Sequence, residues 1–396
     1  MLRYFLMLLF MCEAIQKADV FFTKDISPSS MVKMFKKLNV TLTGKIGLKV
    51  HSGEIGGKYF LSPNFLQEIY DYTNGTFIEC NTAYRAGRHS TEEHRKVLAQ
   101  NGWLDNNRRT VIMDEDPSLD FNLSIPNPVS ISENIVGSRL KEFDSCLVLS
   151  HFKGHGMGGY GGALKQLSIG FASQKGITWI HTAGKLTDWP QAFKTGTTQI
   201  EFTSAMGDSA SSIVNYFRER GGIAFISVVA NISKSCDCAG ASAPAPKIKD
   251  IGILASIDPI AIDRAGLDLI KKYTDEGTEE LLSQIKRLEG ENTVFVAEKH
   301  GIGSQEYNFI DVDSDPDSKP DSDPNSKPDS GSDSKPETNT GSESNNTMTI
   351  VIICIVIFAV IVIAVVIGLI IYRKRNQEPS EKEKENTAED NKLMDE

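Results

Sequence analysis

The sequence contains too few cysteines to build a fold from disulfide bonds. Six cysteines occur among 396 residues. Four of them lie outside the apolar segments at the two ends of the chain: Cys80, Cys146, Cys236 and Cys238. Small secreted scaffolds that depend on disulfides have far more cysteine per residue. We therefore expect the fold to rest on a hydrophobic core.

Positive charge is also scarce. The chain has 42 Lys and Arg residues against 52 Asp and Glu residues, a formal net charge of −10 at pH 7. Domains that bind nucleic acid carry a clustered excess of basic residues, so we predict no nucleic-acid partner. The phosphate loop of nucleotide hydrolases is missing as well, because no Gly-Lys-Ser/Thr follows the glycines near residue 155.

Both ends of the chain carry long apolar segments. Residues 1–18 have the form of a secretory signal peptide, with an arginine, an apolar run and then small residues. Residues 350–372 form a charge-free apolar segment followed at once by three basic residues, which is typical of a transmembrane helix with a cytosolic tail at residues 373–396. The sequence predicts a single-pass type I membrane protein of the plasma membrane or an endomembrane.

Between these ends we expect a lumenal or extracellular domain at residues 19–310 and an acidic stalk at residues 311–349. The stalk repeats an eight-residue unit of Asp, Ser, Pro and Lys without any aromatic residue, so it cannot bury a core. Five Asn-x-Ser/Thr sites agree with entry into the secretory pathway and predict a glycoprotein: Asn39, Asn74, Asn122, Asn231 and Asn345.

Apolar runs of strand length alternate with helix-forming segments through the predicted domain. Strands are expected at residues 20–22, 46–50, 76–80, 110–113, 146–149, 177–180, 223–229 and 251–255, and helices at residues 28–38, 63–72 and 91–101. Such alternation predicts an α/β fold, with a largely parallel sheet and helices on both of its faces.

A glycine-rich stretch at residues 146–170 is the most distinctive part of the chain. It is expected to form a strand, a glycine loop and a helix that begins at Ala163, with His151, Lys153 and His155 in the loop. Backbone N–H groups in such a loop can bind an anion. We predict a ligand site that includes four of its glycines: Gly156, Gly159, Gly161 and Gly162. A tight turn with incidental histidines is the alternative.

A nicotinamide dinucleotide site is disfavoured, although three glycines of this loop match Gly-x-Gly-x-x-Gly. That fingerprint also requires an acidic residue at the end of the next strand. The next expected strand, residues 177–180, ends instead at His181.

Polar side chains follow several of the expected strands. His51, Asn81, Asp114 and His151 each come after a different strand. In α/β sheets, ligands bind outside the carboxyl ends of strands, so these side chains are predicted to line one crevice. Later in the chain, Asp258 and Asp263 could join them, or could act only as a helix cap and a first-turn acid.

A Cys-Asp-Cys loop at residues 236–238 is the best candidate for metal binding. Cys236, Asp237 and Cys238 could hold a divalent metal ion together with His151, His155 or His181. The two thiols could instead cycle as a redox pair or serve only the structure.

Two classes of function remain open. In an enzyme, Lys153, His155 and Lys165 would be the catalytic candidates, with histidine as ligand or general base and lysine binding a small anionic substrate. Alternatively, the domain performs no chemistry and acts as a stalked surface receptor or adhesin. The sequence does not decide whether the protein is an enzyme.

Five motifs resemble the domain of unknown function 362 family, which occurs widely in bacteria and archaea and often as iron–sulfur centre proteins. The motifs are KVHSGE at residues 49–54, NTAYRAGRHSTEEH at 81–94, SHFKGHGMGGYGGALKQLSIG at 150–170, CDC at 236–238 and DIGILASIDPIAID at 250–263. The resemblance implies an iron–sulfur role, but it supplies no established function.

The chain departs from that family in two ways. Many relatives carry a ferredoxin-like run of cysteines before the CDC loop, whereas residues 170–235 contain no cysteine here. Because a four-iron cluster needs four cysteine ligands, we do not expect one within this chain. The stalk and the apolar anchor also lie outside the common pattern, which suggests a membrane-anchored, eukaryotic-type member.

Overall fold

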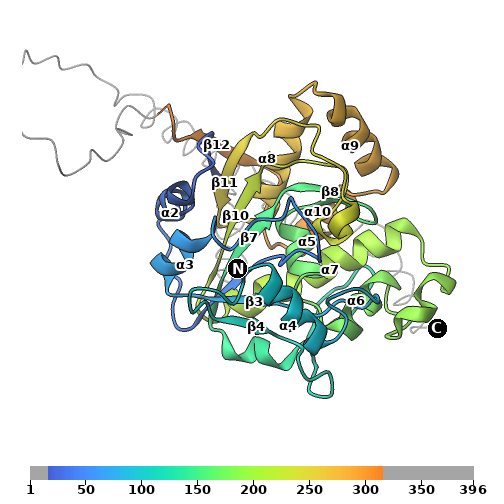
Figure 1. Ribbon diagram of the computed structural model, residues 1–396. Coiled ribbons are helices and arrows are strands. Elements are labelled where there is room, and N and C mark those ends of the chain that lie inside the picture. Colours follow the sequence, from blue (N-terminus) through green and yellow to red (C-terminus); the bar gives the residue numbers. More distant parts are fainter. Residues whose placement is uncertain (1–16, 315–396) are drawn as a thin grey trace, which may run out of the picture. The chain divides into compact units, whose positions relative to one another are not determined.

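The computed structural model describes residues 17–314, and its centre is one eight-stranded sheet with the order β12-β1-β11-β10-β7-β2-β3-β4 (Figure 1). Five of the seven strand pairings are parallel, and β11 is antiparallel to both of its neighbours. The strands are β1 (Ala18–Thr23), β2 (Ile46–Lys49), β3 (Thr76–Glu79), β4 (Thr110–Ile112), β7 (Ser145–His151), β10 (Ile223–Val229), β11 (Gly252–Ser256) and β12 (Tyr307–Asp311).

Helices and short hairpins connect these strands. The helices are α2 (Pro28–Lys37), α3 (Gln67–Thr73), α4 (Thr91–Gln100), α5 (Ala163–Ser168), α6 (Gln174–His181), α7 (Gln199–Arg218), α8 (Pro259–Lys271), α9 (Glu276–Arg287) and α10 (Asn292–Lys299). The 3-10 turns are η1 (Ser138–Glu142), η2 (Trp189–Lys194) and η3 (Asp237–Ser242), and the hairpin strands are β5 (Phe121–Ser124), β6 (Glu133–Val136), β8 (Lys153–His155) and β9 (Gly159–Gly161).

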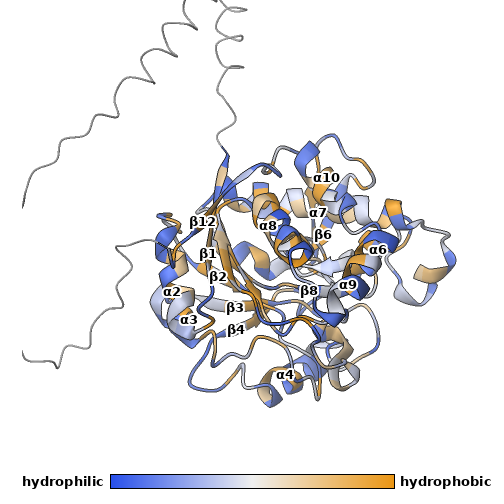
Figure 2. Cartoon of the chain, turned by 90° about the horizontal axis from the view of Figure 1, so that it is seen from above, coloured by the Kyte–Doolittle hydropathy of each residue, from blue (hydrophilic) through white to orange (hydrophobic). Residues whose placement is uncertain are grey.

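The sheet is buried on both faces, which strand β7 shows residue by residue. Cys146 and Val148 belong to one hydrophobic cluster, while Leu147 and Leu149 belong to another. Because successive side chains of a strand point to opposite faces, these are the two sides of the sheet. Helices α5, α7 and α8 contribute to the first cluster and α2 and α3 to the second, and Figure 2 colours the central strands as hydrophobic. The predicted α/β fold with a largely parallel sheet is confirmed.

Local capping explains where several helices begin. The side chain of Ser27 accepts a hydrogen bond from the backbone N–H of Ser30, and Pro28 occupies the first turn of α2. Ser90 and Glu93 form a reciprocal capping box at α4. Asp258 accepts hydrogen bonds from two backbone N–H groups at the start of α8, so the prediction that it caps a helix is confirmed.

The expected strand at residues 177–180 was wrong, because these residues lie in helix α6. Ser173 caps this helix by accepting a hydrogen bond from the N–H of Gly176. Ile177 and Ile180 are both buried, and their spacing of three places them on one helical face. A run of four apolar residues fits a strand or a helix equally well, and the tertiary contacts decide between them.

The glycine-rich stretch also differs from the expected open loop. After β7 the chain forms a short antiparallel hairpin of β8 and β9, and only then enters α5. Gly159 has a φ of 82°, a left-handed conformation that favours glycine. The hairpin therefore gives the loop a fixed shape before the helix begins.

The folded part extends slightly past residue 310. Strand β12 ends at Asp311, Val312 is buried, and the Asp313 carboxylate accepts a hydrogen bond from Thr23. None of the helices between residues 17 and 314 is long and apolar enough to cross a membrane. The expected transmembrane segment, most of the stalk and nearly all of the expected signal peptide lie outside the described residues.

Candidate metal and ligand site

A cavity of about 160 Å³ lies beyond the carboxyl ends of strands β2, β3, β7 and β10. Seven of the predicted site residues line this cavity: His51, Asn81, His155, Gly156, Lys165, His181 and Cys238. These residues come from segments far apart in the sequence. The parallel arrangement of the four strands brings them to one edge of the sheet.

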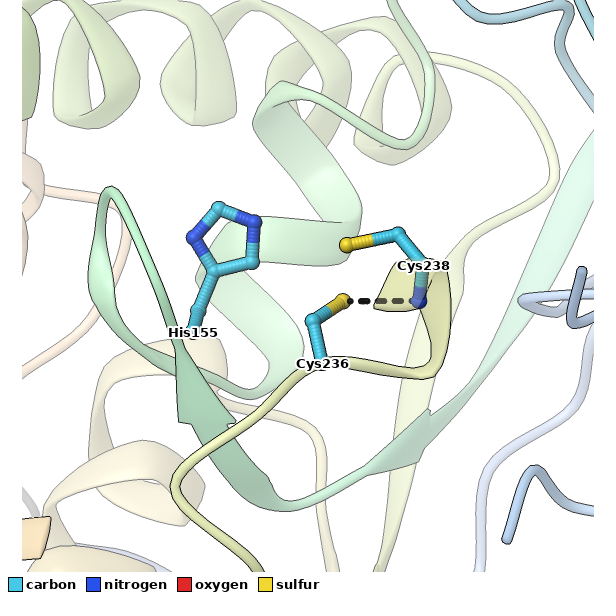
Figure 3. A group of neighbouring side chains, drawn as sticks. All are labelled: His155, Cys236 and Cys238. Carbon is cyan, nitrogen blue, oxygen red and sulfur yellow. Dashed lines mark hydrogen bonds between the residues drawn. The ribbon is translucent and has the colours of Figure 1, made fainter. Parts of the chain in front are cut away.

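Within the described part of the chain, one group of side chains could hold a metal ion, and it consists of His155, Cys236 and Cys238. One potential ligand atom from each residue lies within 4.8 Å of the other two. Figure 3 shows the sulfur of Cys238 pointing toward the ring of His155, and the sulfur of Cys236 pointing toward the backbone nitrogen of Cys238. The backbone N–H of Cys238 donates to the sulfur of Cys236 across 3.4 Å, which holds the two cysteines in a tight turn.

The hairpin supplies the hydrogen-bond donors that face Nδ1 of His155. Nδ1 accepts a hydrogen bond from the N–H of Gly158 at 2.8 Å and faces the N–H of Met157 at 3.4 Å. The other ring nitrogen, Nε2, faces the sulfur atoms (Figure 3). Burial lowers the pKa of His155 to about 3, against the opposing effect of Cys236. The imidazole is therefore neutral, and because Nδ1 accepts, the ring proton lies on Nε2. A metal ion bound at Nε2 would take the place of that proton.

Cys236 and Cys238 shift each other's pKa in opposite directions. The thiol of Cys238 hydrogen-bonds to Cys236, and this contact is the largest cause that lowers the pKa of Cys236; Lys165 and His51 add to it and burial opposes it. The same contact raises the pKa of Cys238. A thiolate is thus favoured at Cys236, as soft-metal ligation requires.

The middle residue of the CDC loop, Asp237, is held apart from the two sulfur atoms. Its carboxylate lies 2.7 Å from the ammonium of Lys153 and 3.0 Å from Nδ1 of His151. These two neighbours hold the pKa of Asp237 below its usual range, although burial would raise it. Asp237, His151 and Lys153 therefore form a buried polar cluster that anchors the CDC loop. This cluster is separate from the group of His155, Cys236 and Cys238.

Glycine allows the hairpin to approach this loop closely. The N–H of Gly154 donates to the carbonyl of Ser233 at 2.7 Å. A Cβ atom on Gly154 would lie only 2.3 Å from the carbonyl oxygen of Lys234. Any larger residue at position 154 would push His155 and the cysteines apart.

Lys165 and Lys153, the two predicted lysines, have different surroundings. Lys165 is 9% exposed and lines the cavity from helix α5. Among residues 17–314, no hydrogen bond or ion pair to its ammonium group is found. Lys165 is therefore available to a ligand, whereas Lys153 is already paired with Asp237.

His181 lines the same cavity but stands outside the metal-binding group. Its Nδ1 donates to the carbonyl of Ile177 at 2.7 Å, and its ring stacks on Phe202 with centroids 4.5 Å apart. Trp189, which sequence reasoning missed, packs edge-on against the same ring at 5.2 Å. Burial lowers the pKa of His181 to about 4.

Arg88 and Glu79 were also missed, and they form the charged floor of the cavity. Arg88 donates to Glu54 at 2.8 Å and to Glu79 at 3.2 Å, and Lys49 lies 2.9 Å from Glu79. A signal was present in the sequence, since Lys49 and Glu79 are charged residues that directly follow apolar residues at the ends of two strands. Charged residues are rarely buried unless they are paired.

The predicted acidic ligands hold the backbone instead of lining the cavity. Asp263 accepts hydrogen bonds from the N–H groups of Ala163 and Leu164 at the start of α5. The helix end where an anionic ligand was expected is thus occupied by a carboxylate of the chain itself. Asp258 holds the start of α8, as described above, and also accepts from the N–H of Ser304.

Asp114 accepts hydrogen bonds from the N–H groups of Asn81 and Gln174 and is not among the residues that line the cavity. Of the four predicted glycines, one lines the cavity and three belong to the hairpin or to the start of α5. Gly156 lines the cavity, Gly159 and Gly161 are in β9, and Gly162 directly precedes α5.

These features define an α/β domain with a buried sulfur and imidazole group at the carboxyl edge of its sheet. The chain belongs to the family described as Domain of unknown function (DUF362), whose sequence model matches residues 46–268. The match covers the hairpin, the CDC loop and most of the sheet, and it confirms the family resemblance of the sequence motifs.

Two solved structures are similar to the chain. The lactate racemase apoprotein from Thermoanaerobacterium thermosaccharolyticum is 12% identical with a TM-score of 0.35, and the match covers 65% of this chain and 57% of that one. A protein from Thermotoga maritima is 15% identical with a TM-score of 0.34, over 69% of this chain and 58% of that one. This chain therefore spans less than two thirds of either structure. No curated protein matched the sequence.

Proposed function

We propose that the domain binds one transition metal ion, such as Zn²⁺, through Nε2 of His155 and the sulfur atoms of Cys236 and Cys238. The observation that carries the proposal is the placement of three ligand atoms within 4.8 Å of one another, two of them on buried residues and one on the half-buried Cys238. Thiolate and imidazole are the ligands that zinc and other soft or borderline metals prefer.

The proposed metal ion would keep one coordination position for a ligand. Structural zinc sites have four protein ligands, whereas catalytic sites have three and leave the fourth position open. Three protein ligands are available here, and Cys238 and His155 line the cavity. A small molecule in the cavity could therefore reach the metal.

A receptor or adhesin that binds through its surface receives less support. His155 is 7% exposed and Lys165 is 9% exposed, and both line the cavity. Side chains that recognise a large partner would lie on an accessible surface. The buried arrangement instead favours a small ligand.

A thiol redox pair is the second candidate, because Cys236 and Cys238 are both free thiols in one tight turn. In that case the two thiols would lose two electrons and two protons to an external disulfide and form a disulfide bond with each other. A redox role of this kind would need no metal.

Metal analysis of the purified full-length protein tests the proposal. After loading with Zn²⁺ and removal of free metal, the unaltered protein should retain about one ion per chain, and the double variant Cys236→Ser, Cys238→Ser should lose it. Cys80→Ser is the matched control, since Cys80 also lines the cavity but is not in the ligand group. Equal metal content in the double variant and the unaltered protein would remove these cysteines from the site.

A further inference from the structure

A second cavity, of about 140 Å³, adjoins the cavity of the candidate metal site. The two cavities share three lining residues, Met157, His181 and Trp189. We call the second cavity the aromatic pocket, because six of its lining residues are apolar or aromatic: Met157, His181, Trp189, Ala192, Phe193 and Phe202. The three proposed metal ligands are not part of its lining. The aromatic pocket is therefore a separate compartment.

The rings of the aromatic pocket come from helix α6, the turn η2 and helix α7. Trp189 lies edge-on to both His181 and Phe193, with ring centroids 5.2 and 5.3 Å apart. Phe202 stacks on His181 at 4.5 Å. Aromatic rings attract one another at such distances. Because Phe193 is 70% exposed, this cluster is open to solvent, unlike a core, and an aromatic molecule can extend it.

His181 offers a hydrogen-bond acceptor to such a molecule. Its Nδ1 lies 2.7 Å from the carbonyl oxygen of Ile177, which can only accept, so Nδ1 carries the ring proton. Burial lowers the pKa of His181 to about 4, which keeps the ring neutral and leaves Nε2 as an acceptor. The two nitrogens of an imidazole point in nearly opposite directions, so Nε2 is directed away from the backbone of α6. It has no hydrogen-bond partner within residues 17–314.

Trp189 supplies a donor next to this acceptor. Its Nε1–H makes no hydrogen bond in the described part of the chain. The threonine hydroxyls at the rim are already engaged, since those of Thr195 and Thr197 lie 2.8 Å apart and each is within hydrogen-bond distance of a backbone carbonyl. A hydroxyl group both donates and accepts. One ligand hydroxyl therefore matches the acceptor of His181 and the donor of Trp189.

We propose that the aromatic pocket binds a small phenol, with its ring against Trp189 and Phe193 and its hydroxyl donating to Nε2 of His181. This inference goes beyond the proposed function and does not require the metal ion. Because His181 and Trp189 line both cavities, the hydroxyl of the bound phenol would lie at the wall between the aromatic pocket and the cavity of the metal site.

The size of the aromatic pocket limits the ligand. A water molecule needs about 10–15 Å³ on this measure of volume, so a cavity of about 140 Å³ holds a molecule of roughly ten heavy atoms. Phenol and phenols with a short substituent satisfy this limit. Nucleotides and peptides exceed it.

Ligand-observed NMR titrations of the metal-free, full-length protein near neutral pH test this inference. Phenol should bind about fivefold more tightly than anisole, its methyl ether, because anisole cannot donate the hydrogen bond to His181. Cyclohexanol, which carries the same hydroxyl on a saturated ring, should also bind more weakly than phenol. Equal affinities for phenol and anisole would overturn the inference. Binding of cyclohexanol as tight as that of phenol, or no binding of phenol, would overturn it as well.

The variant His181→Phe should bind phenol and anisole with equal affinity, because it keeps an aromatic ring and loses the acceptor. His89→Phe is the matched control. His89 is also half-buried with Nδ1 near a backbone carbonyl, that of Thr82, but it lines neither cavity. This control should keep the preference for phenol. An undiminished preference in His181→Phe would contradict the inference.

The variant Phe193→Ala tests the wall of the aromatic pocket with little effect on the core, since Phe193 is mostly exposed. It should weaken phenol binding by about fivefold. Phe295→Ala, at an exposed phenylalanine of helix α10 that lines neither cavity, should bind phenol like the unaltered protein. Equal phenol affinity in the two variants would place the phenol elsewhere and overturn the inference. These comparisons remain decisive if His181→Phe does not fold. Failure to retain Zn²⁺ would overturn only the proposed metal site, because the phenol titrations contain no metal.

Discussion

The ammonium group of Lys153 lies 2.7 Å from the carboxylate of Asp237, and both side chains are almost completely buried. Lys153 comes from the first strand of the hairpin, and Asp237 is the middle residue of the CDC loop. The pair joins the two segments that carry the proposed metal ligands. It also directs Asp237 away from the cavity while Cys236 and Cys238 face His155.

We expect Lys153→Met to destabilise the domain and weaken metal binding. Removing one partner of a buried ion pair leaves an uncompensated charge, at a cost of about 3–5 kcal/mol. The double variant Lys153→Met, Asp237→Asn should recover part of the loss, because it removes both charges. Unfolding by denaturant provides the measurement, with the exposed Lys175→Met as control. A loss no greater than that of the control would show that the pair does not stabilise the loop.

The start of helix α5 should be sensitive to any added side chain. A Cβ atom on Gly162 would lie 2.4 Å from Oδ1 of Asp263, the atom that binds the N–H of Ala163. We expect Gly162→Ala to lower the free energy of unfolding by about 1–3 kcal/mol. In contrast, no atom lies within 4 Å of a Cβ on Gly156, so Gly156→Ala should change stability by less than about 0.5 kcal/mol. Similar losses in the two variants would contradict this explanation.

Asp114 should make the stability of the domain depend on pH. Burial raises its pKa to about 7, against the opposing hydrogen bonds from Asn81 and Gln174. The folded protein therefore holds a proton that the unfolded chain releases near pH 4. The resulting stabilisation is fully present below about pH 4 and is lost as the pH rises through about 7. A shift of this size corresponds to at most about 4 kcal/mol.

Denaturant unfolding at pH values of about 5 and 8 measures this contribution. Asp114→Asn should lose less stability between these two pH values than the unaltered protein. Asp116 gives the opposite case, because its hydrogen bond to Ser118 lowers its pKa, so its stabilisation is lost as the pH falls. Asp116→Asn should leave the loss between pH 5 and 8 unchanged. An equally steep loss in Asp114→Asn would assign the pH dependence to other groups.

The four described cysteines should differ in their reactivity toward iodoacetamide in the native protein. Burial raises the pKa of Cys80 and of Cys146, whereas the pKa of Cys236 is lowered mainly by its hydrogen bond with Cys238. Since the thiolate is the reactive form, the peptide that contains the CDC loop should be labelled first. Bound Zn²⁺ should slow this labelling. Mass spectrometry of the labelled peptides checks both expectations, and earlier labelling at Cys80 would contradict them.

The sequence by itself determined the class of fold and part of the site. The alternation of strands and helices along the chain predicted the largely parallel sheet, because helices that connect successive strands pack on the faces of such a sheet. The Asp-Pro pair at residues 258–259 marked a helix start that the structure confirms. The chemistry of His155, Cys236 and Cys238 alone marked them as candidate metal ligands, and the structure brings the three side chains together. The strand and helix pattern and the helix start depend on residues that are close in the sequence.

Only the tertiary structure decided which of these residues act together. Lys153 and Lys165 are both near the glycine-rich hairpin, but Lys153 turns toward Asp237 and Lys165 toward the cavity. Asp263 reaches the start of α5 from about a hundred residues away, and Arg88 meets Glu54 and Glu79 across two loops. Helix α6 forms where a short apolar run also allowed a strand. The spacing of apolar residues within a segment indicates a helix or a strand. Buried charged residues, in contrast, meet their partners only when distant segments pack together.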